Sequence, residues 1–366
     1  MRVRKVALRD FRNFTDLQTF LGDGVNIVYG GNAQGKTNFL ESIYFCAMGR
    51  SQRAGNDREL VRFGQHEAHI QALIEENAHG PARTIDVHIK KSENKKGIAV
   101  DHIPIRKMNE LFGTLLVVMF SPEDLRLVKS GPAERRTFMD MELCQLSAVY
   151  YHALRQYHHA LKQRNNLLKS IPRDASLTET VFIWDEQLCM YARQIMQHRS
   201  EFIDWINRLA GAVHGQMTGG TETLDISYHP GVGDIDSYAE RLRRGLQRDI
   251  QLGSTSVGPH KDDLLFSVNG NDARVFGSQG QQRTAALAAK LAEVEIIRQR
   301  RGTSPVLLLD DVLSELDGKR QAFLIDYIGR EGLQTVITCT GVEDIVRRQL
   351  GARGKVLKMV NGALTL

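Results

Sequence analysis

The sequence predicts an α/β fold that is interrupted by a largely helical insertion. An apolar stretch, Val25–Tyr29, comes directly before a glycine-rich loop and a helical pattern. A second apolar stretch, Val306–Leu309, ends in two adjacent aspartates. Between them, from about residue 132 to 252, apolar side chains recur mostly at helical spacing. Strands that alternate with helices favour a layered head, and we expect the helical segment to be inserted into it.

The first apolar stretch is followed by Gly30-Gly31-Asn32-Ala33-Gln34-Gly35-Lys36-Thr37, and a helix is expected from Asn38 to Met48. Strand, glycine loop, lysine, hydroxyl and helix form the order of a phosphate-binding P-loop. Glycines let backbone N–H groups turn toward phosphate oxygens, and the helix N-terminus adds positive potential. We expect the loop to surround the phosphates, catalytic Lys36 to reach the β- and γ-phosphates, and Thr37 to ligate Mg²⁺.

The second apolar stretch indicates a buried strand that ends at Asp310-Asp311. Two adjacent carboxylates at such a position are costly unless they face a cation or transfer a proton. We expect Asp310 to hold Mg²⁺, directly or through water, and Asp311 to polarise the water that attacks ATP. The alternative is a pair of solvated carboxylates, and the upstream P-loop favours the metal site.

Two other sequence features, at Ser278–Gln281 and at Arg12, each allow a structural and a nucleotide-binding interpretation. Ser278-Gln279-Gly280-Gln281 opens a long helix expected to end at Arg301. Serine followed three residues later by glutamine forms a capping box, while Ser278 and Gly280 at a helix N-terminus can also bind a γ-phosphate. Arg12 lies between Phe11 and Phe14. It is either a solvated arginine at the edge of the core or a residue close to the nucleotide.

The rest of the pattern predicts β-rich and helical segments around these motifs. Lys90-Lys91 and Lys95-Lys96 fall in a turn region, where a solvated hairpin tip is favoured over a DNA contact. Strands are expected around Val3–Leu8, His69–Ile74, Thr84–Ile89, Thr114–Phe120, Leu264–Val268, Ala273–Phe276 and Thr335–Thr340, with a hairpin over Lys355–Leu366. Helices are expected over Glu179–Val213, Tyr238–Ile250 and Gly318–Arg330.

Composition and residue spacing indicate which partners, metal sites and location to expect. The net charge is +5 and the pI is near 9.0, which is compatible with a polyanionic partner. Basic residues that could line a groove for phosphates include Lys129, Arg135, Arg136, Arg155, Lys162, Arg164, Lys169, Arg173, Arg241, Arg243, Arg244 and Arg248. The four cysteines and His158-His159 lack metal-ligand spacing. No signal peptide or membrane-spanning run is present, so we expect a cytoplasmic protein without a membrane partner.

In their order along the chain, these motifs resemble the ATPase head of the ABC type found in SMC proteins, and within that group the RecF family. The stretches that carry the resemblance are the P-loop, Leu8–Phe14, Gln163–Lys169, Gly258–Leu264, Ser278–Gln281 and Leu309–Asp317. The resemblance implies an α/β head with a mixed sheet and an antiparallel β subdomain, residues 1–121 and 254–366. A helical arm domain, residues 122–253, would be inserted into it.

The resemblance further implies ATP and Mg²⁺ as cofactors, an ATP-dependent homodimer, and binding of single-stranded or gapped duplex DNA. It implies action with RecR and RecO in loading RecA, a part in the SOS response, and slow, DNA-dependent ATP hydrolysis used as a switch. Asp311 stands where the wider ABC class often has glutamate, and Thr338-Cys339-Thr340 stands where a histidine is common. The alternative is an ATP-gated DNA-binding adaptor or chromosome-organising clamp with incidental ATPase activity. A nuclease of the overcoming-lysogenization-defect type would need a further acidic metal site, which we do not expect.

Overall fold

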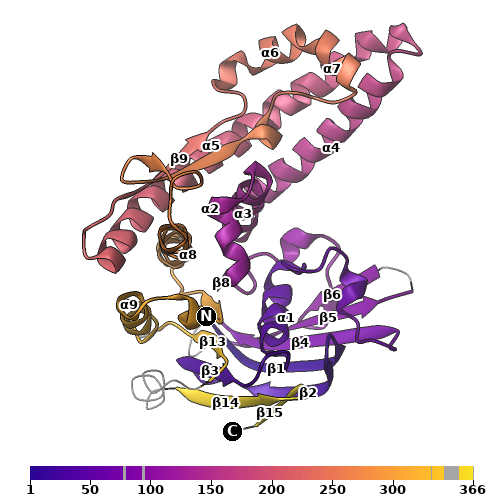
Figure 1. Cartoon of the computed structure of the whole chain (residues 1–366). Helices are drawn as coiled ribbons and strands as arrows, with labels where there is room; N and C mark the ends of the chain where they lie inside the picture. Colours follow the sequence, from indigo (N-terminus) through magenta and orange to yellow (C-terminus); the bar gives the residue numbers. More distant parts are fainter. Residues whose placement is uncertain (77–79, 93–94, 331, 342–353, 366) are drawn as a thin grey trace. The chain divides into compact units, whose positions relative to one another are not determined.

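The computed structural model of the chain describes residues 1–76, 80–92, 95–330, 332–341 and 354–365. The chain divides into two compact units (Figure 1). The first unit comprises Met1–Leu125, Ala212–Thr221 and Ala286–Leu366, and the second comprises Arg126–Gly211 and Glu222–Ala285. The sequence-based boundary at residue 253 lies within the second unit.

A largely parallel sheet forms the centre of the first unit. Its strand order is β15-β14-β3-β13-β12-β8, and only β15 runs antiparallel to its neighbour. Strands β12 and β13 are buried along their whole length. The apolar run of β12 up to Leu309 fits a strand that is covered on both faces. Strand β8 begins at Val117, three residues later than expected from the sequence. The bounds are β3 Val25–Tyr29, β8 Val117–Phe120, β12 Val306–Asp310, β13 Thr335–Cys339, β14 Lys355–Val360 and β15 Ala363–Thr365.

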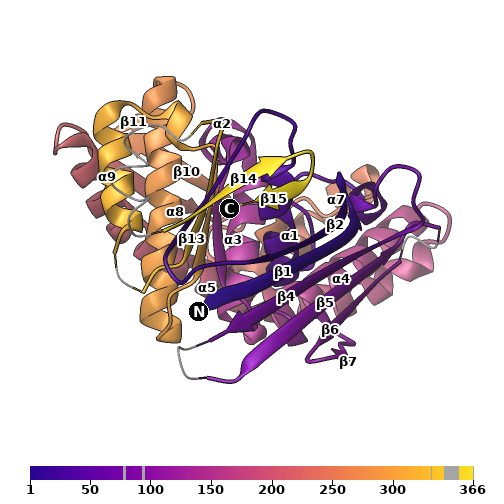
Figure 2. The same cartoon turned by 90° about the horizontal axis from the view of Figure 1, so that it is seen from below.

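An antiparallel sheet of the order β2-β1-β4-β5-β6-β7 completes the β structure of this unit, and Figure 2 shows β1, β4 and β5 side by side. Buried and more exposed residues alternate along β4 and β5, so the sheet has one face in the core. Helix α1, Lys36–Met48, contacts both strands. The bounds are β1 Arg2–Phe11, β2 Phe14–Phe20, β4 Glu67–Glu75, β5 Ala82–Lys90, β6 Lys95–Val100 and β7 Ile103–Pro104.

The lysines expected at a hairpin tip lie at the end of the β5–β6 hairpin, where Lys90 pairs with Lys95 and Lys91 lies in a turn. Lys95 and Lys96 open β6 at this end of the hairpin. The Lys96 amine donates to the carbonyl of Gly49 at 2.6 Å and pairs with the carboxylate of Asp57 at 2.7 Å. Lys96 therefore links β6 to the segment after α1.

Two helices near the end of the chain lie in the first unit, the earlier of them only from Ala286 onward. Helix α9, Gly318–Ile328, is capped by Asp317, whose carboxylate accepts from the backbone N–H of Arg320. The Tyr327 hydroxyl donates to the carbonyl of Leu291 in α8, Gln279–Arg301, which joins the two helices. Short helical turns lie at Asp57–Leu60, Met108–Glu110, Pro122–Leu125 and Leu313–Glu315. Within the part of the chain that the structure describes, no helix has the length and apolar character needed to cross a membrane.

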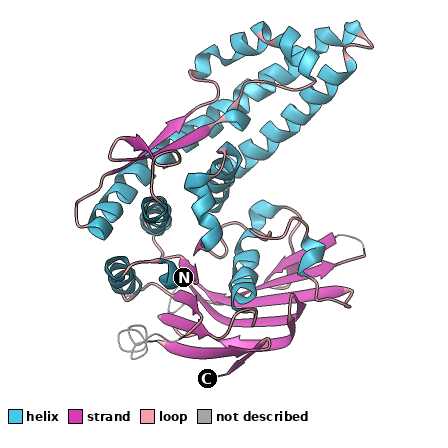
Figure 3. Cartoon of the chain, in the orientation of Figure 1, coloured by secondary structure: helices cyan, strands magenta, loops and turns pink. Residues whose placement is uncertain are grey.

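The second unit consists mainly of helices with a small antiparallel sheet of order β11-β10-β9 (Figure 3). Its helices are α2 Arg126–Lys129, α3 Pro132–Leu146, α4 Ala148–Ser170, α5 Val181–Thr218, which continues into the first unit, α6 Tyr238–Arg244 and α7 Leu246–Leu252. Its strands are β9 Leu224–His229, β10 Asp263–Val268 and β11 Asn271–Asp272, and short turns lie at Ala175–Thr180, Ile235–Ser237 and Pro259–Lys261.

Three expectations for this unit were wrong. Strand β9 lies within the stretch predicted to be helical, because it pairs along its full length with β10. Pairing with a distant strand is a tertiary constraint that local spacing does not report. The helix expected over Tyr238–Ile250 is divided at Gly245 into α6 and α7. Residues Ala273–Phe276 form turns, and the hairpin that begins at β10 ends at Asp272.

Polar groups of the Gly258–Leu264 stretch bind the helices of this unit together. The Nδ1 atom of His260 lies 2.7 Å from the Tyr157 hydroxyl of α4, and burial lowers the pKa of His260 to about 4, so the ring is neutral. The Asp262 carboxylate accepts from Arg199 of α5 and from the backbone N–H of Gly231, each at 2.7 Å. Lys261 between them is exposed. This stretch therefore stabilises the second unit by joining α4, α5 and the segment around Gly231 through hydrogen bonds.

Two arginines considered for a phosphate groove are buried in ion pairs. The Arg164 side chain is fully buried and bonds to Asp185 at 2.6 Å and to Asp249 at 2.7 Å. Arg135 is 3% exposed and makes a two-point contact with Asp263. Because their guanidinium groups are already neutralised inside the unit, neither arginine is free to contact a nucleic acid backbone.

Candidate functional site: a phosphate loop joined to an aspartate strand

The predicted P-loop connects β3 to α1 and has the backbone that such a loop requires. Ala33 and Gly35 adopt positive φ angles of 62° and 113°, and Lys36 is the first residue of α1. The Lys36 amine lies across the loop and donates to the carbonyls of Gly30 and Gly31 at 2.7 and 2.8 Å. It can exchange these carbonyls for the oxygens of a phosphate in the same loop.

An added side chain would meet a neighbouring residue at two loop positions. A Cβ atom on Gly30 would lie 2.3 Å from the carbonyl oxygen of Met359 in β14. A Cβ atom on Gly35 would lie 2.6 Å from the side-chain nitrogen of Asn13. Gly30 is thus needed for close packing against β14, and Gly35 for its left-handed backbone.

The supports of the loop were missed by the sequence analysis. The Asn13 amide donates to the carbonyl of Gln34 at 3.0 Å and accepts from the Asn38 amide at 2.8 Å. On the other side, the backbone N–H of Asn361 donates to the Gln34 side chain at 2.6 Å. Asn361-Gly362 was recognisable as a hairpin turn, but nothing local in the sequence connects that turn to a loop more than three hundred residues earlier.

Asp310 lies directly beside the P-loop. The Thr37 hydroxyl donates to Oδ1 of Asp310 at 3.0 Å, and the Thr338 hydroxyl donates to the same oxygen at 2.7 Å. The sheet order explains this meeting, because β13 pairs in parallel with both β3 and β12. The carboxyl ends of these strands therefore share one edge of the sheet, which is where ligands of α/β sheets bind.

The electrostatics of Asp310 fit a metal-binding role. Its side chain is buried, and desolvation raises the pKa of the carboxyl group, although the hydrogen bonds from Thr338 and Thr37 oppose this rise. A divalent cation beside Oδ1 would stabilise the charged form. Mg²⁺ in nucleotide sites prefers hard oxygen ligands, namely one or two protein groups together with phosphates. The Thr37 hydroxyl and the Asp310 carboxylate therefore fit Mg²⁺.

Asp311, the residue after β12, has a left-handed backbone conformation. Its φ angle is 50°, in the left-handed region that aspartate tolerates better than most residues. Its N–H donates to the Thr338 hydroxyl at 2.9 Å. Thr338 therefore fixes the side chain of Asp310 and the main chain of Asp311 together, a role that the sequence analysis did not foresee.

A further acidic residue acts on this site. Glu123 follows β8, the strand that pairs with β12, and its charge contributes to the raised pKa of Asp310. The sequence analysis did not assign Glu123 a role at this site. The signal available was an acidic residue close after the end of a buried parallel strand.

Arg12 lies at the side of α1. Its guanidinium group makes two bonds of 2.8 Å to the buried carboxylate of Glu41. The adjacent Asn13 is the residue that supports Gln34. Arg12 therefore belongs to the packing that orients α1, and its contact with a nucleotide stays a prediction.

Ser278 and Gly280 belong to the second unit. The Gln281 side chain accepts from the backbone N–H of Ser278 at 2.9 Å, and the Ser278 hydroxyl accepts from the backbone N–H of Gln281 at 3.2 Å. The capping box is thereby confirmed. A Cβ atom on Gly280 would meet only the Ser278 hydroxyl at 3.9 Å, so the N-terminus of α8 is sterically open around this glycine.

Comparisons with known proteins show the family to which the chain belongs. A family model described as the RecF/RecN/SMC N terminal domain matches residues 2–352. A protein of Lachnospira eligens described as DNA replication and repair protein RecF is 49% identical over 364 residues, which cover 99% of this chain and 98% of the relative. This chain belongs to the RecF family. A RecF of Lachnoclostridium phytofermentans is 46% identical, with 100% and 99% covered.

Solved structures of RecF have the same fold. A structure described as the recombination mediator protein RecF with ATP in the RecFOR pathway has a TM-score of 0.91 and 34% identity, and covers 99% of this chain and 96% of its own. A head of an Smc protein matches with a TM-score of 0.59 at 14% identity, with 100% and 96% covered. The second likeness shows the fold alone. The predicted ABC-type head with a mixed sheet and an antiparallel subdomain is confirmed.

Proposed function

We propose that this chain is an ATP-dependent, DNA-binding recombination mediator that dimerises on ATP. The observation that carries this proposal is the hydrogen bond between Thr37 of the P-loop and Asp310, because it unites both halves of a Mg·ATP site in one unit. Membership of the RecF family, whose solved relatives are described with ATP, supports the same nucleotide. Lys36, Thr37 and Asp310 hold Mg·ATP in this proposal, and Asp311 orients the attacking water.

Dimerisation uses the N-terminus of α8. Ser278 and Gly280 of one subunit complete the site of the other, and the contact is repeated by two-fold symmetry. In this proposal the head of residues 1–121 and 254–366 is the ATP-binding part, and residues 122–253 form the DNA-binding arm. ATP binding then drives association, since the nucleotide is shared between the subunits.

The test is the molar mass of the chain by light scattering with saturating ATP and Mg²⁺. The proposal expects a dimer for the wild type and a monomer for Ser278→Arg, while both bind ATP equally. Ser278→Thr keeps the capping hydroxyl and is the matched control. A monomeric wild type at saturating ATP contradicts the proposal.

The DNA-binding role is supported by a row of cations on α4. Arg155, Lys162 and Lys169 are exposed and follow one another at every seventh residue. Residues at this spacing lie on one side of a helix, about 10 Å apart. We propose that they contact DNA phosphates, and that Arg135 and Arg164 do not.

Salt dependence tests this row. Replacing Arg155, Lys162 and Lys169 by glutamate should weaken binding to gapped duplex DNA and lower the slope of log K against log salt by about one per phosphate contact. A control with the same charge change at three other exposed arginines of the second unit, Arg193, Arg208 and Arg243, should keep most of the affinity. Equal losses in both triple variants would reject the row as the contact surface.

The alternative is an ATP-gated DNA-binding adaptor or clamp whose turnover is incidental. It is supported by the short Asp311 side chain in place of glutamate. Asp311→Asn separates the two functions, because it removes the charge that would polarise water and keeps the size of the side chain. DNA binding that persists without hydrolysis favours the adaptor, and a loss of DNA binding favours a mediator that needs turnover. RecR, RecO and RecA are the proposed partners.

A further inference from the structure

The outer face of the antiparallel sheet carries a cluster of histidine and carboxylate groups. Glu67 and His69 are two residues apart on β4, and His88 is the direct cross-strand partner of His69 on β5. Side chains two apart on a strand and directly opposed on a neighbouring strand share one face of a sheet. Ala68 and Ile70, which alternate with these residues, are buried, so the cluster faces away from the core side that α1 contacts.

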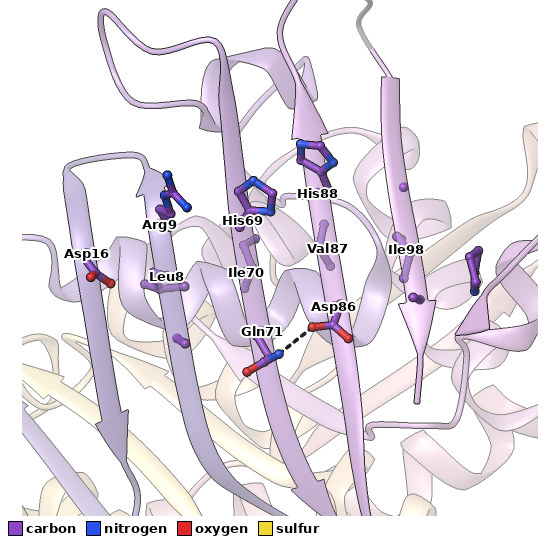
Figure 4. Close-up of a pocket in the computed structure, with 14 residues that line it drawn as sticks. Leu8, Arg9, Asp16, His69, Ile70, Gln71, Asp86, Val87, His88 and Ile98 are labelled. Carbon is purple, nitrogen blue, oxygen red and sulfur yellow. Dashed lines mark hydrogen bonds between the residues drawn. The ribbon is translucent and has the colours of Figure 1, made fainter. Parts of the chain in front are cut away.

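The three side chains already converge. The Nε2 atom of His69 lies 3.4 Å from Oε1 of Glu67, and the Nε2 atom of His88 lies 2.9 Å from Oε2 of the same carboxylate. The two imidazole rings are stacked, with centroids 4.2 Å apart and planes inclined by 11° (Figure 4). One ligand atom from each residue lies within 4.8 Å of the others. Zinc bonds of 2.0–2.2 Å in a tetrahedral arrangement separate ligand atoms by about 3.4 Å, so small side-chain rotations bring the cluster to that geometry.

We propose that Glu67, His69 and His88 form a binding site for a divalent transition-metal ion of the zinc class. Two imidazoles and one carboxylate are the ligands that such ions prefer, while Mg²⁺ and Ca²⁺ prefer oxygen alone. The site is separate from the Thr37–Asp310 pair, and it does not depend on nucleotide binding. Three protein ligands leave one position for water or an exogenous donor.

The residues around the cluster leave space for an ion and also place a positive charge beside it. His69 and His88 line a hollow of about 460 Å³ on this face, together with Gln71, Asp86 and Arg9. Asp86 is engaged elsewhere, since its carboxylate accepts from Gln71 at 2.7 Å and contacts His102 at 3.0 Å. Arg9 is the cross-strand partner of His69 on β1, and its positive charge opposes a cation bound beside that ring.

The electrostatic state of Glu67 agrees with this placement. Its contacts with His88 and His69 lower the pKa of its carboxyl group, so the carboxylate is charged at neutral pH. Binding a metal replaces these two hydrogen bonds by coordination. Each imidazole then presents a neutral nitrogen to the ion and carries its proton on the other ring nitrogen or releases it.

Isothermal titration of the untagged full chain with Zn²⁺, in the absence of nucleotide, tests the proposal. We expect one Zn²⁺ per chain at this site, and a loss of affinity of at least about tenfold for each of His69→Gln, His88→Gln and Glu67→Gln. His102→Gln is the matched control, because it removes an exposed histidine of the β6–β7 turn that contacts the Asp86 carboxylate, and it should leave the affinity unchanged. Arg9→Gln should tighten binding.

A Co²⁺ titration distinguishes this site from the cysteines. Coordination by histidine and carboxylate gives visible absorption without the near-ultraviolet charge-transfer band of a thiolate. Thermal unfolding without metal should be nearly the same for the wild type and the histidine variants, since these side chains are partly exposed. Zn²⁺ affinity that is unchanged in the His69→Gln/His88→Gln double variant, or a thiolate band with Co²⁺, overturns the proposal.

Discussion

Thr338→Val is the most informative single change at the nucleotide site. The Thr338 side chain is fully buried, donates to Asp310 at 2.7 Å and accepts from the N–H of Asp311 at 2.9 Å. Valine has nearly the same shape and removes only the hydroxyl. A hydrogen bond to a charged group contributes about 1.5–3 kcal/mol, and one between neutral groups contributes about 1 kcal/mol. We therefore expect the variant to lose about 2–4 kcal/mol of stability.

The functional loss should depend on magnesium. Without the Thr338 hydroxyl, Asp310 keeps only its bond to Thr37, and ordering the carboxylate around a cation becomes costlier. A cost of about 1.4 kcal/mol corresponds to tenfold weaker binding of Mg·ATP, while ATP binding in EDTA should change little. Urea unfolding and fluorescence titration with a labelled ATP measure the two effects. Thr338→Ser, which keeps the hydroxyl, is the control. Stability and Mg·ATP affinity equal to wild type in Thr338→Val would refute this reasoning.

Three other predictions concern stability and the loop. The folded-state pKa of Asp310 is raised above its ordinary value of 3.8. The charged carboxylate therefore destabilises the nucleotide-free chain above the folded-state pKa, and this penalty disappears as the pH falls toward the ordinary value. Asp310→Asn should accordingly raise the melting temperature at neutral pH but not near pH 3. Arg164→Met should cost about 3–5 kcal/mol in urea unfolding because it leaves Asp249 buried and charged, and adding Asp249→Asn should recover part of this. Gly35→Ala should abolish ATP binding in a filter assay, since its φ angle is 113° and the added Cβ meets Asn13; normal binding would show that the loop can rearrange.

The sequence predicted the parts of the site that form continuous motifs. The P-loop combines a strand, glycines and a helix start within fifteen residues, so the local pattern contains nearly all of the geometry. The strand before Asp310 is equally explicit, because a continuous apolar run needs burial on both faces. The parallel arrangement of β3, β13 and β12 then brings Thr37 to Asp310.

What the sequence could not provide are contacts between distant segments. Asn13, Asn361 and Thr338 have ordinary local roles in a turn, a hairpin and a strand, and only the folded sheet places them around the loop and the aspartates. The same limit applies to Arg164, which looks like any basic residue of an amphipathic helix until its two buried carboxylate partners are known. Strand β9 was missed for this reason as well, since its partner β10 lies more than thirty residues away.

The central claim is that the P-loop and Asp310 bind one magnesium nucleotide together. Equilibrium binding of ATP with Mg²⁺ and with EDTA, measured on the wild type and on Asp310→Ala, tests it most directly. The account predicts that Mg²⁺ tightens ATP binding markedly in the wild type and has little effect in the variant, while both bind ATP similarly in EDTA. An equal effect of Mg²⁺ on the two proteins would contradict it.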